Sequence, residues 1–225
     1  MEEPVIQIGL DFSLASREVI EILLEDTSGP GVFDEIAKAN TGRPEILKLL
    51  IEHPDTPSDV YAYVSGILHL PVKAERDIPE AERDRVKRAP KIFQKIQKLN
   101  VSGKIQLALK GGREIRSILI KDPNKEVMQS VLSNQKITDS EIEMIARSRQ
   151  VPEEMLRRIS KNREWVKNYA ITQALVTNPK TPPGISVSLV SHLKRKDISI
   201  LEKNRNVSEA VRSVAKRLLM ARRQK

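Results

Sequence analysis

The chain contains no cysteine, three histidines and only seven aromatic residues among 225, and each shortage narrows the range of functions. Without cysteine there is no disulfide framework, no thiolate ligand for zinc or an iron–sulfur cluster, and no thiol nucleophile. The scarcity of aromatic rings argues against single-stranded nucleic-acid binding, which usually stacks several bases on aromatic side chains. The histidines His53, His69 and His192 are isolated in sequence, so we expect capping or surface roles for them rather than metal binding or acid–base catalysis.

Long apolar runs are also missing. No stretch approaches the roughly 18 consecutive apolar residues of a membrane span. The first residues are acidic, whereas a secretory signal would be basic and then apolar. With 39% apolar and 31% charged residues, the chain has enough apolar side chains to fold. We therefore expect a soluble, cytoplasmic protein without membrane insertion.

The formal net charge of +9 conceals an uneven distribution. Residues 1–70 hold 4 basic and 13 acidic side chains, residues 71–100 hold 9 and 5, and residues 101–225 hold 26 and 12. Such asymmetry favours an anionic partner for the basic region, although charge runs often serve only to solvate a helical face. It also raises the prediction that the acidic region packs on the basic one, within one chain or between two copies.

Helical periodicity dominates the chain. Apolar residues recur at spacings of three and four, as in Ile46 with Leu50 and Met155 with Ile159, while alternation with period two is rare. Prolines and asparagines fall between these runs, where helices end and restart. The sequence therefore predicts an all-α protein.

The junctions between helices form two interleaved series. In the first series, apolar residues stand seven, three and two positions before His53, Asn134 and Asn178; the second series is Asp122, Asn162 and Asn204. The spacing is 44 residues from Asn134 to Asn178, and 40 and then 42 residues along the second series. A period of about 40–44 residues with two helices per unit predicts an α-solenoid of helical hairpins of the HEAT or armadillo kind.

The junction residues suit a helix, a tight turn and a second helix. Helices commonly end on Gly or Asn in the left-handed conformation, and we expect this of the Asn anchors. Threonines that follow the turns should accept hydrogen bonds from the first amides of the next helix, and prolines suit its first turn. The residues concerned are Thr56, Thr138, Thr181, Pro57 and Pro182. Thr138 and Glu141 have the spacing of a capping box.

These junctions resemble a known class of repeat. The stretch Thr172-Gln-Ala-Leu-Val-Thr-Asn-Pro-Lys-Thr-Pro-Pro-Gly-Ile is similar to HEAT-like and leucine-rich-repeat-variant units of bacteria, and Asn162-Arg-Glu-Trp-Val-Lys-Asn-Tyr resembles uncharacterised proteins of that type. The resemblance covers about residues 101–220. It implies a repeat fold that presents interaction surfaces and carries no shared catalytic residues.

Three regions follow from charge and repeats. Residues 1–70 form an acidic helical region with one repeat-like junction at His53, residues 71–100 form either a charged linker or an exposed helix, and residues 101–225 form a basic HEAT-like repeat domain. No phosphate-binding loop, His-Glu-x-x-His or Gly-x-Ser-x-Gly motif occurs. Gly111-Gly112 before Arg113 could form a phosphate site, but a helix-terminating turn is its commoner use.

We therefore expect a non-enzymatic scaffold or adaptor without cofactors that binds another macromolecule, in the first place a protein. The alternative is sequence-nonspecific contact with the backbone of a nucleic-acid duplex, and a third reading is a HEAT-like DNA-processing enzyme. Trp165 could stack on a base or a cation; in the alternative reading, Trp165 or Tyr169 fills a gap between repeats. The candidate partner-binding residues are Arg113, Arg116, Lys121, Arg157, Arg158, Lys161, Arg163, Trp165 and Lys167.

Overall fold

A computed structural model describes residues 11–26, 31–70 and 85–221, with side chains from Ile92 onward in the last segment. Every regular element in this part is helical: fifteen α-helices and one short 3-10 helix, η1 (Phe12–Leu14), with no strand. The all-α prediction is confirmed. Within the same residues, no helix combines the length and apolarity required to cross a bilayer.

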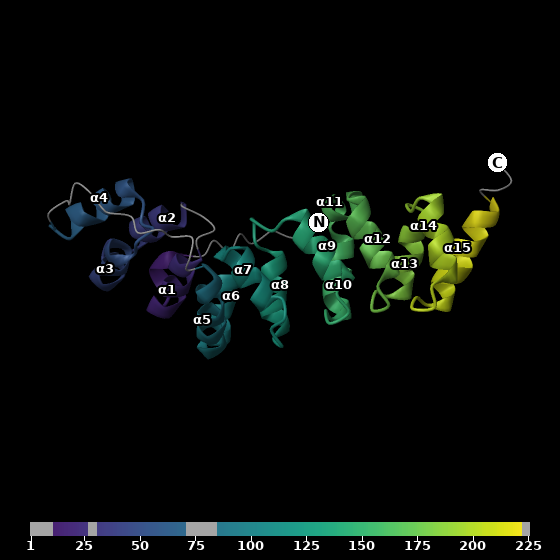
Figure 1. Cartoon of the computed structure of the whole chain (residues 1–225), viewed down its shortest axis with the longest axis horizontal. Coiled ribbons are helices and arrows are strands. Elements are labelled where there is room, and N and C mark those ends of the chain that lie inside the picture. Colours follow the sequence, from purple (N-terminus) through teal and green to yellow (C-terminus); the bar gives the residue numbers. More distant parts are fainter. Residues whose placement is uncertain (1–10, 27–30, 71–84, 222–225) are drawn as a thin grey trace, which may run out of the picture. The chain divides into compact units, whose positions relative to one another are not determined.

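The chain divides into two compact units, Met1–Lys136 (unit 1) and Ile137–Lys225 (unit 2). The helices are labelled in Figure 1. Beyond η1, unit 1 contains α1 (Arg17–Glu25), α2 (Gly31–Ala39), α3 (Pro44–Glu52), α4 (Ser58–Ile67), α5 (Arg85–Lys98), α6 (Val101–Lys110), α7 (Arg113–Leu119) and α8 (Lys125–Leu132). Unit 2 contains α9 (Asp139–Arg147), α10 (Glu153–Lys161), α11 (Arg163–Lys167), α12 (Tyr169–Thr177), α13 (Pro183–Val190), α14 (Arg195–Lys203) and α15 (Glu209–Ala221).

In unit 1, acidic N-terminal helices and the first basic helices share one packed body. Helix α1 contacts both the N-terminal helices α2 and α3 and the later helices α5 and α6. A β-carbon added to Gly103 of α6 would lie 3.2 Å from Val19 Cγ2 of α1. Of the segment expected to be a linker or an exposed helix, residues 71–84 lie outside the described part, and residues 85–98 form α5.

Most helices pack against helices close to them in chain order, whereas α1 also packs against the more distant α5 and α6. In unit 2, α9 contacts α12, α12 contacts α13, and α15 contacts α13 and α14 (Figure 1). Met155, Ile159, Ile171 and Leu175 are each at most 2% exposed, as their helical spacing predicts. Burial of such side chains, each contributing about 1.5–3 kcal/mol, is the main favourable term that holds these short helices together.

All six junction anchors make the same local hydrogen bond. The side chain of each anchor accepts from the backbone N–H two residues later: His53 from Asp55, Asp122 from Asn124, Asn134 from Lys136, Asn162 from Glu164, Asn178 from Lys180 and Asn204 from Asn206. This is the geometry of an Asx turn, in which a side-chain acceptor imitates a backbone carbonyl.

The prediction that the Asn anchors adopt the left-handed conformation is wrong. Asn162, Asn178 and Asn204 have φ near −80° and ψ between 106° and 121°, and His69 is the single described non-glycine residue with positive φ. Because the side chain itself satisfies the turn amide, the backbone does not need to enter the left-handed region to reverse direction.

Two anchors also hold the end of an earlier helix. Asn134 Nδ2 donates to the carbonyl oxygens of Ala108 (2.8 Å) and Gly111 (3.0 Å). Asn178 Nδ2, 44 residues later, donates to the carbonyls of Ala146 and Ser148 in the same way. Both asparagines are buried. These bonds satisfy carbonyl groups that the end of a helix would otherwise leave unpaired.

Only one of the three expected threonine caps forms. Thr138 caps α9 and makes the full capping box with Glu141. Thr56 instead donates its hydroxyl to the Leu50 carbonyl, and the hydroxyl of Thr181 has no partner among the described residues. The N-cap positions of α4 and α13 are prolines, so the expectation for Thr56 and Thr181 is wrong.

Candidate anion-binding groove

Two asparagine caps shape the middle of unit 2. Asn162 Oδ1 accepts from the amides of Glu164 and Trp165, and Asn168 Oδ1 accepts from Ala170 N, so the chain is divided into α10, the short α11 and α12. Arg163 and Lys167 stand four residues apart on α11 and therefore share a face of it. The caps thus place two basic side chains on one face of a short helix between α10 and α12.

A shallow groove of about 420 Å³ lies beside α11. The groove is lined by Ser160, Arg163, Val166, Lys167, Tyr169, Thr172 and His192. The lining comes from the end of α10, from α11, from the start of α12 and from the turn that follows α13. Among the described lining residues, none carries a carboxylate. The groove therefore offers cations and apolar surface without competing negative charge.

The basic side chains of the groove differ in whether they already have a partner. Arg163 is exposed and has no ion-pair partner within the described residues. The His192 imidazole is exposed and likewise has none. Lys167 Nζ lies 2.7 Å from Glu164 Oε1, but both side chains are at least 70% exposed, so water screens this pair and a ligand can displace it at little cost. Arg163 and His192 are the groups most available to an anion.

Tyr169 joins the start of α12 to the start of α14. Its hydroxyl donates to the Asp197 carboxylate and accepts from the backbone N–H of Lys194 at 3.1 Å. Lys194 Nζ lies 4.8 Å from the centre of the tyrosine ring, within cation–π range. Burial raises the pKa of the Tyr169 hydroxyl, and the hydrogen bond and negative charge of Asp197 raise it further, outweighing the opposite effect of the Lys194 N–H. This cluster holds the turn that carries His192 beside α12.

The remaining basic candidates of unit 2 lie on α10. Arg157 and Arg158 are exposed, and Arg157 makes two hydrogen bonds, of 2.6 and 3.0 Å, to the carboxylate of Glu153. Lys161 is exposed at the end of the helix. None of the three lines the groove. Trp165 is half-buried on α11 and does not line it either.

The three candidate partner-binding residues of unit 1 differ in their exposure. Arg113 begins α7 and Lys121 follows it, and both are exposed. Arg116 is only 5% exposed, and its Nη1 donates to the Gly111 carbonyl at 2.9 Å. A guanidinium buried on a backbone carbonyl stabilises the turn between α6 and α7 and is not presented to a partner.

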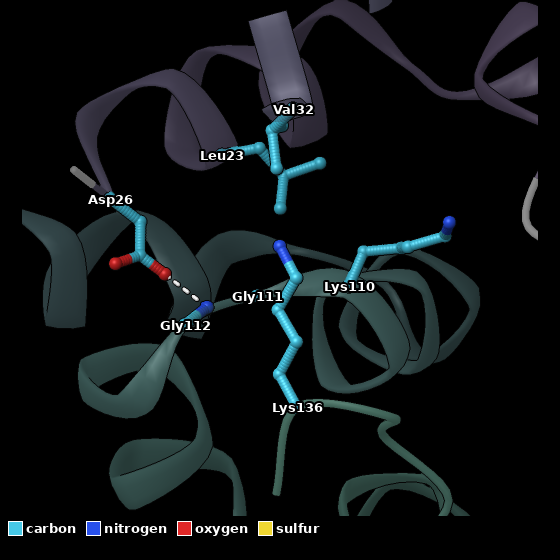
Figure 2. A pocket seen from close by; sticks show the side chains of 7 residues that line it. All are labelled: Leu23, Asp26, Val32, Lys110, Gly111, Gly112 and Lys136. Carbon is cyan, nitrogen blue, oxygen red and sulfur yellow. Dashed lines mark hydrogen bonds between the residues drawn. The ribbon is translucent and has the colours of Figure 1, made fainter. Parts of the chain in front are cut away.

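Gly111 and Gly112 form a helix-terminating turn, as the commoner reading of the pair predicts. Gly111 is the C-cap of α6 and Gly112 the N-cap of α7. Figure 2 shows the Asp26 carboxylate directed at Gly112, whose N–H donates to it, at a small pocket into which the Lys136 side chain also points. The pocket measures about 10 Å³, the volume of a single water probe, so the alternative of a phosphate site has no room here.

Sequence alone does not place His192 beside Arg163. It is separated from Arg163 by 29 positions, and no motif links the two. Within the described residues, no group of three or more His, Asp or Glu side chains is placed to hold a metal ion. His53 packs against Phe33, with ring centroids 5.4 Å apart.

Comparison with known proteins finds no family model, curated protein or solved structure that matches this chain.

Proposed function

We propose that this protein is a non-enzymatic α-solenoid of HEAT-like hairpins whose unit 2 binds the phosphate backbone of nucleic acid without reading sequence. One observation carries the proposal. Unit 2 holds 19 Lys and Arg against 9 Asp and Glu, a formal charge of +10, whereas unit 1 holds 20 against 21. The positive excess of the chain therefore lies in the sequence of unit 2, and such a concentration attracts polyanions and their counterions.

The helical-repeat part of the proposal has its own support. The anchors Asn134 and Asn178 make equivalent long-range hydrogen bonds, and all six junctions make the same local one. In unit 2 the main helix contacts join helices at most three positions apart in chain order. A stack of hairpins produces both properties, because each hairpin buries its apolar face only on the adjacent ones.

The charge balance of unit 1 strengthens the contrast with unit 2. Acidic side chains of α1 and α2 pair with lysines of later helices: Glu25 with Lys95 at 2.5 Å and Glu35 with Lys110 at 3.2 Å. The acidic residues of the N-terminal third thus offset the basic residues that follow within the same unit. In unit 2, by contrast, 19 basic side chains stand against 9 acidic ones.

An acidic protein surface is the second candidate partner, as part of a scaffold or adaptor role. The Glu25–Lys95 and Glu35–Lys110 pairs favour it, because in each pair a lysine of one helix binds a carboxylate of another helix. The low aromatic content, three Phe, three Tyr and one Trp, suits either partner. In the nucleic-acid case it restricts the contact to a duplex backbone.

Fluorescence anisotropy with a labelled duplex of random sequence tests the proposal. We expect binding at low salt that weakens at least about tenfold between about 50 and about 200 mM salt, with equal affinity for unrelated sequences. Absence of binding at the lower salt concentration, or affinity unchanged by salt, would reject the nucleic-acid function. Salt-dependent binding of polyglutamate in place of the duplex would then favour the acidic protein.

A further inference from the structure

We infer that the groove beside α11 is the site on unit 2 that binds a phosphate group of the nucleic-acid backbone, with Arg163, Lys167 and His192 as its ligands. This inference rests on the proposed function and adds a location to it. It depends on the shape and lining of one groove, whereas the proposed function depends on the total charge of unit 2.

The groove gathers hydrogen-bond donors from two segments that are far apart in sequence. Arg163 and Lys167 come from α11, and His192 comes from the turn after α13. Donors that approach from different directions suit a tetrahedral phosphate, which accepts hydrogen bonds on several oxygens. A guanidinium also matches two phosphate oxygens at once with its planar fork.

The two carboxylates next to the groove already have hydrogen-bond or ion-pair partners. The Asp197 carboxylate accepts the hydrogen bond of the Tyr169 hydroxyl. Glu164 is paired with Lys167, and both side chains are exposed. An incoming phosphate therefore displaces one screened ion pair and meets no carboxylate in the lining.

The hydrogen bonds of Tyr169 fix the position of the segments that line the groove. The backbone N–H of Lys194 donates to Tyr169 Oη at 3.1 Å, which fixes the chain two residues beyond His192. The hydroxyls of Thr172 and Ser160 are bound to the carbonyls of Val166 and Arg157. The groove wall is thereby held in place before any ligand arrives, which lowers the ordering cost of binding.

A charge-matched pair of double variants tests the site. Arg163→Ala with Lys167→Ala removes two groove cations, and Arg149→Ala with Lys203→Ala removes two exposed cations of the same unit that do not line the groove. All four residues are exposed, so both variants should keep the helical circular-dichroism spectrum and thermal midpoint of the parent chain.

In duplex anisotropy at fixed salt, we expect the groove variant to lose about tenfold or more in affinity, and the control about threefold or less. The salt slope of the groove variant should fall by nearly 2, which is the release of two fewer counterions. Equal losses for the two variants would overturn the groove assignment while leaving the proposed function intact. If the parent chain binds no duplex, the proposed function fails first.

The three histidines provide an independent readout. Titration of the full chain with duplex, followed by imidazole NMR signals, should shift His192 and leave His53 and His69 in place. The His192 signal is assigned by its loss in His192→Gln. A His192 signal that stays unchanged at saturation would overturn the site. A groove variant that loses polyglutamate binding but binds duplex as the control does would overturn it in favour of an acidic protein.

Discussion

The side-chain amide of Asn178 donates a 2.7 Å hydrogen bond to the carbonyl oxygen of Ala146, 32 residues earlier in the chain. The same amide reaches Ser148 O, and its oxygen accepts from Lys180 N. One buried side chain thus closes the end of α9 and shapes the turn between α12 and α13. Asn134 makes the equivalent hydrogen bonds in unit 1. An asparagine therefore pairs backbone groups that would otherwise lack partners at both junctions.

Replacing this asparagine should destabilise unit 2. Asn178→Ala removes the hydrogen bonds to one buried carbonyl, one half-buried carbonyl and one turn amide, and we expect a loss of about 1–3 kcal/mol in the free energy of unfolding. Urea denaturation followed by the fluorescence of Trp165, the single tryptophan of the chain, reports on unit 2. Asn206→Ala, at an exposed position, is the control and should change stability by less than about 0.5 kcal/mol. Equal midpoints for both variants would show that the buried bonds add nothing.

A methyl group at Gly111 should disrupt the turn between α6 and α7. A β-carbon there would lie 2.6 Å from the Leu107 carbonyl oxygen and 2.8 Å from Ile115 Cβ, so the backbone has to move. We expect Gly111→Ala to lower the free energy of unfolding by about 1–3 kcal/mol, measured by thermal denaturation with circular dichroism.

Gly42→Ala is the matched control in the same unit. A β-carbon at Gly42 meets nothing within 4 Å, and its φ is not positive. Substitution there should be neutral or stabilising by up to about 1 kcal/mol, because it restricts the unfolded chain. A Gly111→Ala protein as stable as the Gly42→Ala protein would contradict the close packing of the turn.

The Tyr169 hydroxyl should stabilise unit 2 in a pH-dependent manner. Its pKa is raised in the folded protein by burial first and by the Asp197 carboxylate second. The folded state therefore keeps this proton at a pH where the unfolded chain, with an ordinary tyrosine pKa near 10, releases it. The stability that the hydroxyl contributes is complete below about pH 10 and is lost as pH rises through the higher folded-state pKa.

Tyr169→Phe measures this contribution. At neutral pH the variant should be less stable by about 1 kcal/mol, and the difference from the parent chain should shrink as pH rises above about 10. The measurement is again the urea midpoint from Trp165 fluorescence, and Tyr63→Phe, which alters a 44% exposed ring in unit 1, is the control. A difference that stays constant or grows at alkaline pH would contradict a raised pKa.

Local features were predictable from sequence because their causes are local. The spacing of Met155 and Ile159 predicts a helix that buries one face, and both residues are buried. The capping box of Thr138 and Glu141 spans three residues, and it forms as expected. The positions of the six junction anchors were found from periodicity alone, although the backbone conformation of the asparagines was not.

Long-range features required the folded chain. Arg116 and Arg113 stand three residues apart and look alike in sequence, but only Arg116 turns onto the Gly111 carbonyl and is buried. His192 joins Arg163 at one groove because the Tyr169 hydroxyl holds the turn before α14 against α12.

By itself the sequence determined the helical content, the positions of the junctions and the total charge, since these follow from residue type and short-range spacing. The tertiary structure decided which of those charges are paired. It brought Glu25 to Lys95 and Glu35 to Lys110, because ion pairing depends on which helices pack together. The absence of cysteine and the scarcity of aromatics limit what a site can contain, and the packing of α10 to α14 determines where the groove lies.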